Sequence, residues 1–104
     1  MASAAILVVD DNPVDISVLR AMLRKDDYDF IAADSGHAAL DIVRANPSFD
    51  LIVLDVHMSD INGIEVCRRL KADAATRSIP IVLVSGVQTD DPSIKEGLEA
   101  GADG

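Results

Sequence analysis

The sequence lacks most of the features that mark secreted or membrane-spanning proteins. Its single cysteine, Cys67, excludes an intramolecular disulfide. No apolar stretch approaches the length of a membrane span, and the start of the chain lacks the basic and then long apolar pattern of a signal peptide. We therefore expect a cytoplasmic protein without a membrane partner.

Basic residues are also scarce. Lys and Arg number 9 against 18 Asp and Glu, which gives a formal net charge of -9. Direct binding of nucleic acid by this segment is not expected, because such binding depends on basic patches that neutralise phosphates. The acidity favours cations and basic protein surfaces, or it serves to keep a solvated surface soluble.

Aromatic residues make up 3% of the chain, and tryptophan is absent. With 49% hydrophobic residues in 104, the chain can still bury a core of Val, Ile, Leu and Ala within one domain. A core of this kind suits a parallel sheet that is covered by helices.

Apolar runs alternate with segments of helical periodicity, and no linker separates a second domain. The predicted strands cover residues 5–9, 29–33, 51–54 and 79–84. The predicted helices follow Asn12-Pro13, run from Ser35 to before Pro47, follow Asn62, and open near Asp91-Pro92. Because parallel crossovers are right-handed, this order predicts an α/β fold with helices on both faces of a parallel sheet.

Each predicted helix has an apolar side that should face the core. Asn12, Ser35 and Asn62 are the expected N-caps, and Glu65 forms a pattern like a capping box with Asn62. The core-facing sets are Val18, Leu19, Met22 and Leu23; Ala39, Leu40, Ile42 and Val43; Gly63, Val66, Cys67, Leu70 and Ala74; and Ile94 with Leu98. Cys67 is thus expected to be a small buried hydrophobic residue.

Acidic and hydroxyl side chains follow three of the predicted strands. Asp10 and Asp11 close the first run, Asp55 closes the third and Ser85 closes the fourth. Ligands of open α/β sheets bind outside the carboxyl ends of the strands, so these four residues should converge. Carboxylates that close together repel one another unless a cation binds among them, and Mg²⁺ is the expected cation. The alternative is that each Asp merely forms a turn.

Taken together, Asp10-Asp11, Asp55 with residues 58–63, Ser85-Gly86 and the closing residues 101–104 resemble the receiver domain of bacterial two-component response regulators. The resemblance covers essentially the whole chain. It implies a flavodoxin-like doubly wound sheet with strand order 2-1-3-4 and no fifth βα unit in this chain.

The resemblance also implies roles for these residues. Asp55 would accept a phosphoryl group from a phosphohistidine on a sensor histidine kinase or phosphotransfer protein, or from a small phosphodonor. Asp10, Asp11, Asp55 and the backbone carbonyl of His57 would bind Mg²⁺, with Asp10 acting mainly through water. Ser85 would hydrogen-bond the phosphoryl group and switch the conformation, to regulate an output domain downstream. The chain would not be an enzyme, although it would assist its own phosphorylation and dephosphorylation.

Some parts of the family pattern are missing. The pattern continues into a fifth strand, which delivers a lysine to the phosphoryl group, and into a fifth helix, so we expect residues 1–104 to be a C-terminally incomplete receiver. With Met1 just before the first strand, we expect this receiver to lie at the N-terminus of its protein. The alternative is a short form that pairs as a homodimer to cover its sheet edge. Ser59 and Asn62 replace the usual proline and aspartate.

Three other functions fit the sequence less well than a phosphoacceptor receiver. A pseudo-receiver would keep the fold and act only as a protein-interaction module, as the absent lysine suggests. A phosphatase with an aspartate nucleophile would need a second Asp where His57 stands. A nucleotide-binding module would need a glycine-rich loop after the first strand, which is not there. The His57 and His37 rings are expected to be exposed to solvent.

Overall fold

The computed structural model describes residues 5–23 and 29–84, in which strands and helices alternate along the chain. Its elements are β1 (Ala5–Val9), α1 (Pro13–Leu23), β2 (Asp29–Ala33), α2 (Gly36–Ala45), β3 (Leu51–Asp55), α3 (Gly63–Ala72) and β4 (Ile81–Val84). The first two predicted strands have the predicted bounds, and the third extends one residue further, to Asp55. The helix predicted near Asp91-Pro92 lies outside the described residues.

The segment between α3 and β4 differs from the prediction. The helix ends at Ala72, so Ala74 lies beyond it and is exposed rather than core-facing. The strand begins at Ile81 rather than Ile79, because the Ile79 N–H donates to the Thr76 carbonyl (3.1 Å) and Pro80 has no N–H to donate. The Pro80 carbonyl still accepts from the Ile52 N–H (2.9 Å), so pairing with β3 starts beside the proline.

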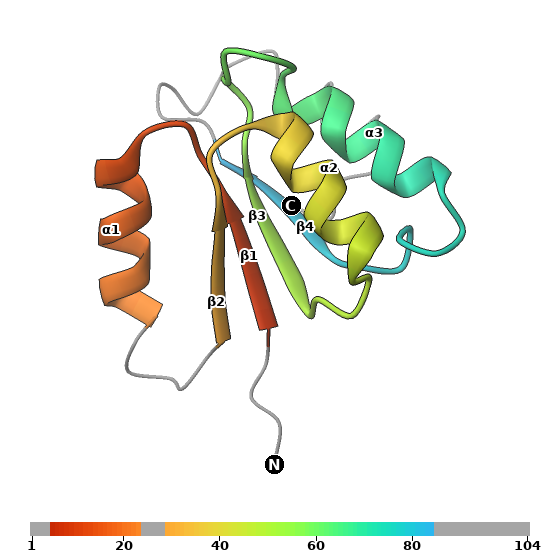
Figure 1. The fold of residues 1–104 in the computed structure, drawn as a ribbon, viewed down its shortest axis with the longest axis horizontal. Helices are drawn as coiled ribbons and strands as arrows, with labels where there is room; N and C mark the ends of the chain where they lie inside the picture. The colour runs from red at the N-terminus through yellow and green to blue at the C-terminus, as the bar shows by residue number, and fades with distance from the viewer. Residues whose placement is uncertain (1–4, 24–28, 85–104) are drawn as a thin grey trace.

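The strands form one parallel sheet with the order β2-β1-β3-β4. In Figure 1, α1 lies on one side of this sheet, and α2 and α3 lie on the other. Right-handed crossovers produce this division, because the chain moves outward from β1 to β2 and then back across β1 to β3 and β4. The predicted doubly wound α/β class and its strand order are confirmed.

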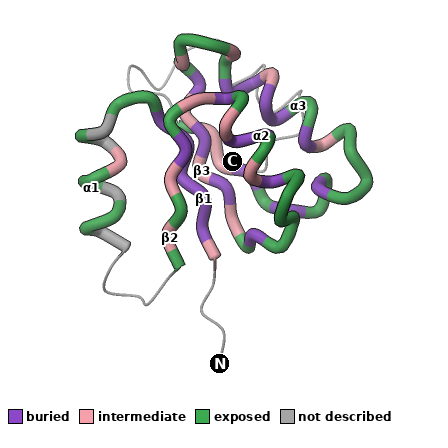
Figure 2. The backbone as a smooth tube through the Cα atoms, viewed as in Figure 1, coloured by how far each residue is buried: buried purple, intermediate pink, exposed green. Residues whose placement is uncertain are grey.

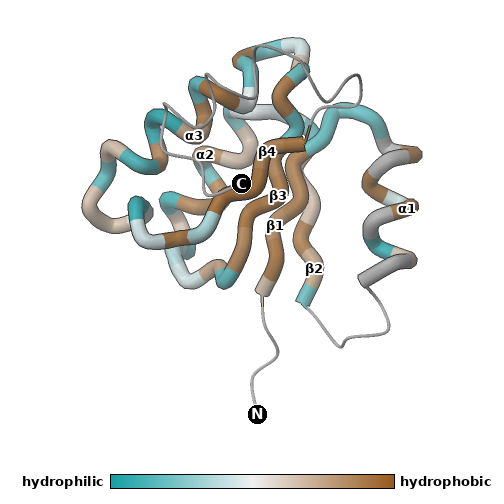
Figure 3. The backbone as a smooth tube through the Cα atoms, turned by 180° about the vertical axis from the view of Figure 1, so that it is seen from behind, coloured by the Kyte–Doolittle hydropathy of each residue, from teal (hydrophilic) through white to brown (hydrophobic). Residues whose placement is uncertain are grey.

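Among the described residues, a hydrophobic core cluster lies between the sheet and the pair α2 and α3 (Figure 2). Strand β1 is buried nearly throughout, as the central strand of a parallel sheet should be, and the strands form the brown apolar centre of Figure 3. The predicted buried faces of α2 and α3 are confirmed for Ala39, Leu40, Val43, Val66, Cys67 and Leu70, and Gly63 is buried as well.

Of the predicted core-facing residues of α1, the structure describes the side chain of Val18, whereas those of Leu19, Met22 and Leu23 lie outside the description. Val18 is 54% exposed, so its predicted place on a core-facing side is wrong. Ile31 of the edge strand β2 is 39% exposed, and it lies on the face of the sheet opposite α1, because it pairs in register with Leu7 of the core cluster. The helix contacts β2 through Arg20, whose guanidinium lies 4.9 Å from the centre of the Phe30 ring. None of the described helices is long and apolar enough to cross a membrane.

Candidate functional site

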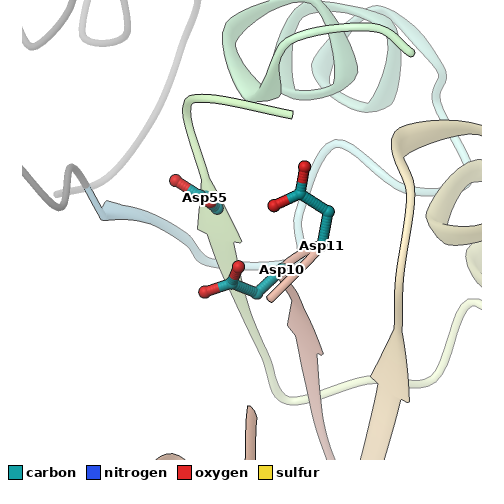
Figure 4. Close-up of side chains that lie close together, drawn as sticks. All are labelled: Asp10, Asp11 and Asp55. Carbon is teal, nitrogen blue, oxygen red and sulfur yellow. The ribbon is translucent and has the colours of Figure 1, made fainter. Parts of the chain in front are cut away.

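The three aspartates predicted to converge lie together at the carboxyl ends of β1 and β3. Asp10 and Asp11 directly follow β1, and Asp55 is the last residue of β3. The strands are neighbours, with Val9 paired to Leu54, so both chain segments leave the sheet at the same edge. One carboxylate oxygen from each aspartate lies within 4.8 Å of the others (Figure 4). Ser85, the fourth predicted member, lies outside the described residues.

Backbone hydrogen bonds fix Asp10 at the end of its strand. Its N–H donates to the Ala33 carbonyl of β2 (3.1 Å), and its Oδ1 accepts from the Asn12 N–H (2.9 Å). Asn12 Oδ1 in turn accepts from the Val14 N–H (2.9 Å), which confirms Asn12 as the cap of α1. Asp10 is therefore a buried turn former as well as a member of the cluster. Asp11 next to it is exposed.

Asp55 is more exposed than Asp10 and less exposed than Asp11, and the pKa of its carboxyl group is raised. Burial raises the pKa of the Asp55 carboxyl group above its ordinary value, and the negative charge of Asp11 raises it further. A hydrogen bond from the His57 N–H to Asp55 Oδ1 (3.2 Å) and one with Asp10 act in the opposite direction. The His57 side chain itself is exposed, as predicted.

The donor set fits a hard divalent cation. Mg²⁺ takes oxygen ligands at about 2.1 Å in octahedral geometry, so two of its ligands lie about 3.0–4.2 Å apart. Carboxylate oxygens within 4.8 Å of one another need small side-chain adjustments to reach that spacing. A cation would also offset the repulsion that raises the pKa of Asp55. The cluster is thus chemically suited to Mg²⁺ or a similar ion.

The start of α3 packs directly against the end of β3. A Cβ atom on Gly63 would collide with the carbonyl oxygen of Asp55, so glycine permits this close approach. The Gly63 N–H donates to the Val56 carbonyl (2.9 Å), which closes the loop that follows Asp55. Asn62 caps α3 as predicted, because its Oδ1 accepts from the Glu65 N–H (2.9 Å).

The Glu65 carboxylate departs from the predicted capping-box pattern. It accepts hydrogen bonds from Arg68 and Arg69, each at 3.0 Å. These arginines lie one helical turn further along α3, so the pairs stabilise the exposed side of the helix. Glu65 therefore contributes to the helix surface rather than to its cap.

One polar residue near the site was not predicted. The Asp60 carboxylate accepts from the backbone N–H groups of Gly36 (3.0 Å) and His37 (2.9 Å), and its Oδ2 lies 2.8 Å from His37 Nδ1. These bonds hold the pKa of Asp60 far below its ordinary value. No local sequence pattern marks the contact, because 23 and 24 residues separate the partners.

The parallel doubly wound sheet and the acidic cluster at its carboxyl edge define a receiver-type architecture. The family model for the response regulator receiver domain matches residues 6–104. The chain therefore belongs to the response regulator receiver domain family, as the sequence motifs predicted. Receiver domains of response regulators are signalling modules of two-component systems.

The relatives agree with this family. Response regulator PleD of Caulobacter vibrioides is 42% identical over 100 residues, which are 96% of this chain and 22% of PleD. The chain thus spans about a fifth of the length of that relative.

Solved structures agree as well. A response regulator structure from Chloroflexus aurantiacus superposes with a TM-score of 0.90 at 31% identity, covering 97% of this chain and 81% of the other. The structure of the phosphorylated cyanobacterial phytochrome response regulator RcpA superposes with a TM-score of 0.88 at 26% identity. The superposition covers 98% of this chain and 78% of RcpA.

Proposed function

We propose that this chain is a phosphoacceptor receiver domain that takes a phosphoryl group onto Asp55 with the help of Mg²⁺. The observation that carries the proposal is the cluster of Asp10, Asp11 and Asp55 at one edge of the sheet, with oxygens within 4.8 Å of one another. Membership of the receiver family supports it. The structural relative RcpA is described as phosphorylated, which supports the same chemistry.

The transfer is a nucleophilic displacement at phosphorus. A carboxylate oxygen of Asp55 forms a bond to the phosphorus atom as the bond from phosphorus to the donor breaks. With a phosphohistidine donor the imidazole nitrogen leaves and regains its proton, and with a small acyl phosphate the carboxylate leaves. The hydrogen bond from the His57 N–H to Asp55 Oδ1 orients the attacking group.

The metal ligands would be Asp10, Asp11, Asp55 and the backbone carbonyl of His57. When bound, Mg²⁺ supplies positive charge that neutralises the phosphoryl oxygens. Asp10 is buried and its Oδ1 already accepts from the Asn12 N–H, so it suits a contact through water. Asp11 is exposed and free to turn toward an ion that arrives from solvent.

The remaining roles follow from the family. The donor would be a sensor histidine kinase or a phosphotransfer protein in the cytoplasm. Ser85 would hydrogen-bond the phosphoryl group and pass the change on to an output domain. The chain would assist its own phosphorylation and dephosphorylation without acting on a further substrate. A chain that folds and keeps its cluster but accepts no phosphoryl group would instead be a pseudo-receiver.

Intact-protein mass spectrometry after incubation with acetyl phosphate tests this proposal. We expect the wild type to gain one phosphoryl group in the presence of Mg²⁺ and none in the presence of EDTA. Asp55→Asn, which keeps the size of the side chain, should gain none. An equal gain in the variant, or a gain without Mg²⁺, would refute the assignment.

The metal part of the proposal is tested by titration. Asp11→Ala should weaken Mg²⁺ binding about tenfold or more, since even residues that only support a metal ligand contribute 10–100-fold to affinity. Isothermal titration calorimetry of the wild type and the variant with Mg²⁺ measures the difference. Asp41→Asn, an exposed acid on α2, is the matched control for lost charge. Unchanged affinity in Asp11→Ala would exclude it as a ligand.

A further inference from the structure

We infer that Asp60 is a positioning residue, which holds the loop after Asp55 in place for the metal site by binding the N-terminus of α2. The inference rests on the proposed function, because it assigns a supporting residue to the same site. The loop concerned covers residues 56–62, between β3 and α3.

The contact is a fork of three hydrogen bonds. Oδ1 of Asp60 accepts from the Gly36 N–H, and Oδ2 accepts from the His37 N–H and lies within bonding distance of His37 Nδ1. A carboxylate at the first turn of a helix also interacts favourably with the helix dipole. Hydrogen bonds to a charged acceptor are stronger than those between neutral groups. The Asp60 side chain is 24% exposed, and of the three hydrogen bonds the one from the Gly36 N–H is partly buried, whereas the two to His37 lie at the surface.

Helix α2 already has a cap of its own. Ser35 is its N-cap, and the Ser35 hydroxyl accepts from the Ala38 N–H (3.1 Å). Asp60 takes the two earlier N–H groups, which Ser35 does not bind. The effect of Asp60 is therefore to join α2 to the loop rather than to start the helix.

Packing beside the fork is as close as glycine allows. A Cβ atom on Gly36 would lie 2.5 Å from Ile61 Cγ1 and 3.1 Å from the Ile61 carbonyl oxygen. Because real Cβ atoms do not come within 2.5 Å of another atom, a side chain at position 36 would force the Ile61 side chain to move and would crowd the loop backbone. The hydrogen bonds of Asp60 and the packing of Ile61 against Gly36 thus hold neighbouring residues of the loop against α2.

The rest of the loop is fixed by its two ends. The Val56 N–H donates to the Val84 carbonyl (3.0 Å), and the Gly63 N–H donates to the Val56 carbonyl (2.9 Å). His57, with the carbonyl proposed as a metal ligand, lies between Val56 and Asp60. Losing the Asp60 contact should therefore let His57 shift relative to the aspartates, since a metal site depends on the groups that orient its ligands.

The test compares Mg²⁺ binding and Asp55 phosphorylation in the wild type, Asp60→Ala and Asp60→Asn. The matched control is Asp41→Asn, which removes the same charge from the exposed surface of α2. Each protein is titrated with Mg²⁺ by calorimetry below its unfolding temperature. The titrations are made at about 0.15 M and about 1 M salt, where charges are screened beyond about 8 Å and 3 Å respectively.

We expect Asp60→Ala to weaken Mg²⁺ binding about tenfold at both salt concentrations and to slow phosphorylation by acetyl phosphate in parallel. Asp60→Asn, which keeps an acceptor oxygen for one of the N–H groups, should retain part of the affinity. Asp41→Asn should stay within about twofold of the wild type, because a distant charge is screened. A purely structural cap would lower the melting temperature and leave the affinity of the folded protein unchanged.

The outcomes separate the inference from the proposed function. If the wild type neither binds Mg²⁺ nor accepts a phosphoryl group, the proposed function fails and the inference fails with it. If the wild type does both and Asp60→Ala matches Asp41→Asn, the inference alone is overturned. If Asp60→Ala does not fold, His37→Ala is used in its place, because it removes only the exposed imidazole that contacts Asp60. We expect His37→Ala to weaken Mg²⁺ binding by a smaller factor than the loss of Asp60 would. An unchanged Mg²⁺ affinity in His37→Ala would overturn the inference.

Discussion

The three aspartates of the cluster differ in environment, and the difference suits different tasks. Asp10 is buried and held by backbone hydrogen bonds, Asp11 is exposed, and Asp55 lies between them. A nucleophile needs access to its donor as well as an environment that favours reaction over solvation, and Asp55 has both. In the proposed function, the two residues at the end of β1 would supply the negative charge that attracts a cation to it.

The raised pKa of Asp55 makes a prediction about stability. Ionised Asp55 disfavours the folded state, because its pKa is higher in the folded than in the unfolded chain. This cost is absent at a pH below the unfolded-state pKa and is complete above the folded-state pKa. In EDTA at pH 7, Asp55→Asn should therefore raise the melting temperature of the domain, because the neutral amide avoids the cost of burying the charge.

Thermal unfolding followed by circular dichroism between pH 3 and pH 8 measures this effect. The increase in melting temperature caused by Asp55→Asn should become smaller as the pH falls through the range in which Asp55 becomes protonated. Added Mg²⁺ should also reduce the difference in melting temperature between the variant and the wild type, because Mg²⁺ stabilises the folded wild type by binding to it. A variant that melts below the wild type at pH 7 without Mg²⁺ would contradict the account.

Among the elements, the junction of β3 with α3 matters most for the site. Asn62 caps the helix, and Gly63 brings its first turn against the last residues of the strand. The cap could be predicted from sequence because Asn is a common helix N-cap. The reason for Gly63 could not, because it depends on how closely the helix approaches the backbone of Asp55.

Substituting this glycine should disturb both the fold and the site. Gly63→Ala places a methyl group against the Asp55 carbonyl and should destabilise the domain by about 1–3 kcal/mol, as overpacking does elsewhere. Urea unfolding gives this free energy, and a Mg²⁺ titration of the folded variant should show weaker binding. Ser59→Ala, in the exposed part of the same loop, is the control and should change neither. A Gly63→Ala variant as stable as the control would contradict the close approach.

Prediction from sequence worked for elements defined by local pattern. The strands predicted at 5–9 and 29–33 match the structure residue for residue, and an aspartate, Asp10 or Asp34, follows the end of each. Prediction from sequence worked less well where contacts between distant parts of the chain determine the structure. The chain turns back at Ile79 before β4 can start, and Asp60 meets α2 from a distant part of the sequence.

At the scale of the whole molecule, the side chains that the structure describes differ in burial between α1 and the pair α2 and α3. Strands, α2 and α3 bury a continuous cluster that includes Leu7, Ile52 and Leu54, whereas α1 leaves Val14 and Val18 exposed. Periodicity alone placed Val18 on a buried side, because a helical pattern shows which residues share a face and not how completely that face is covered. The convergence of Asp10, Asp11 and Asp55 was predictable, because parallel strands end at one edge.

This difference in burial predicts unequal costs for truncating side chains at buried and exposed positions. Leu7→Ala, at a fully buried position, should destabilise the domain by about 2–5 kcal/mol. Val18→Ala on α1 should change stability by no more than about 0.5 kcal/mol. Urea unfolding of both variants measures the two free energies. Comparable losses would contradict the difference in burial between Leu7 and Val18.

The central claim is that Asp55 carries the phosphoryl group, and locating that group tests it most directly. The protein is incubated with acetyl phosphate and Mg²⁺ and then treated with borohydride, which reduces an aspartyl phosphate to homoserine. Peptide mass spectrometry then identifies the converted residue. The account predicts conversion at Asp55 and none in samples prepared with EDTA. Conversion at Asp10, Asp11 or another residue, or none in any sample, would contradict it.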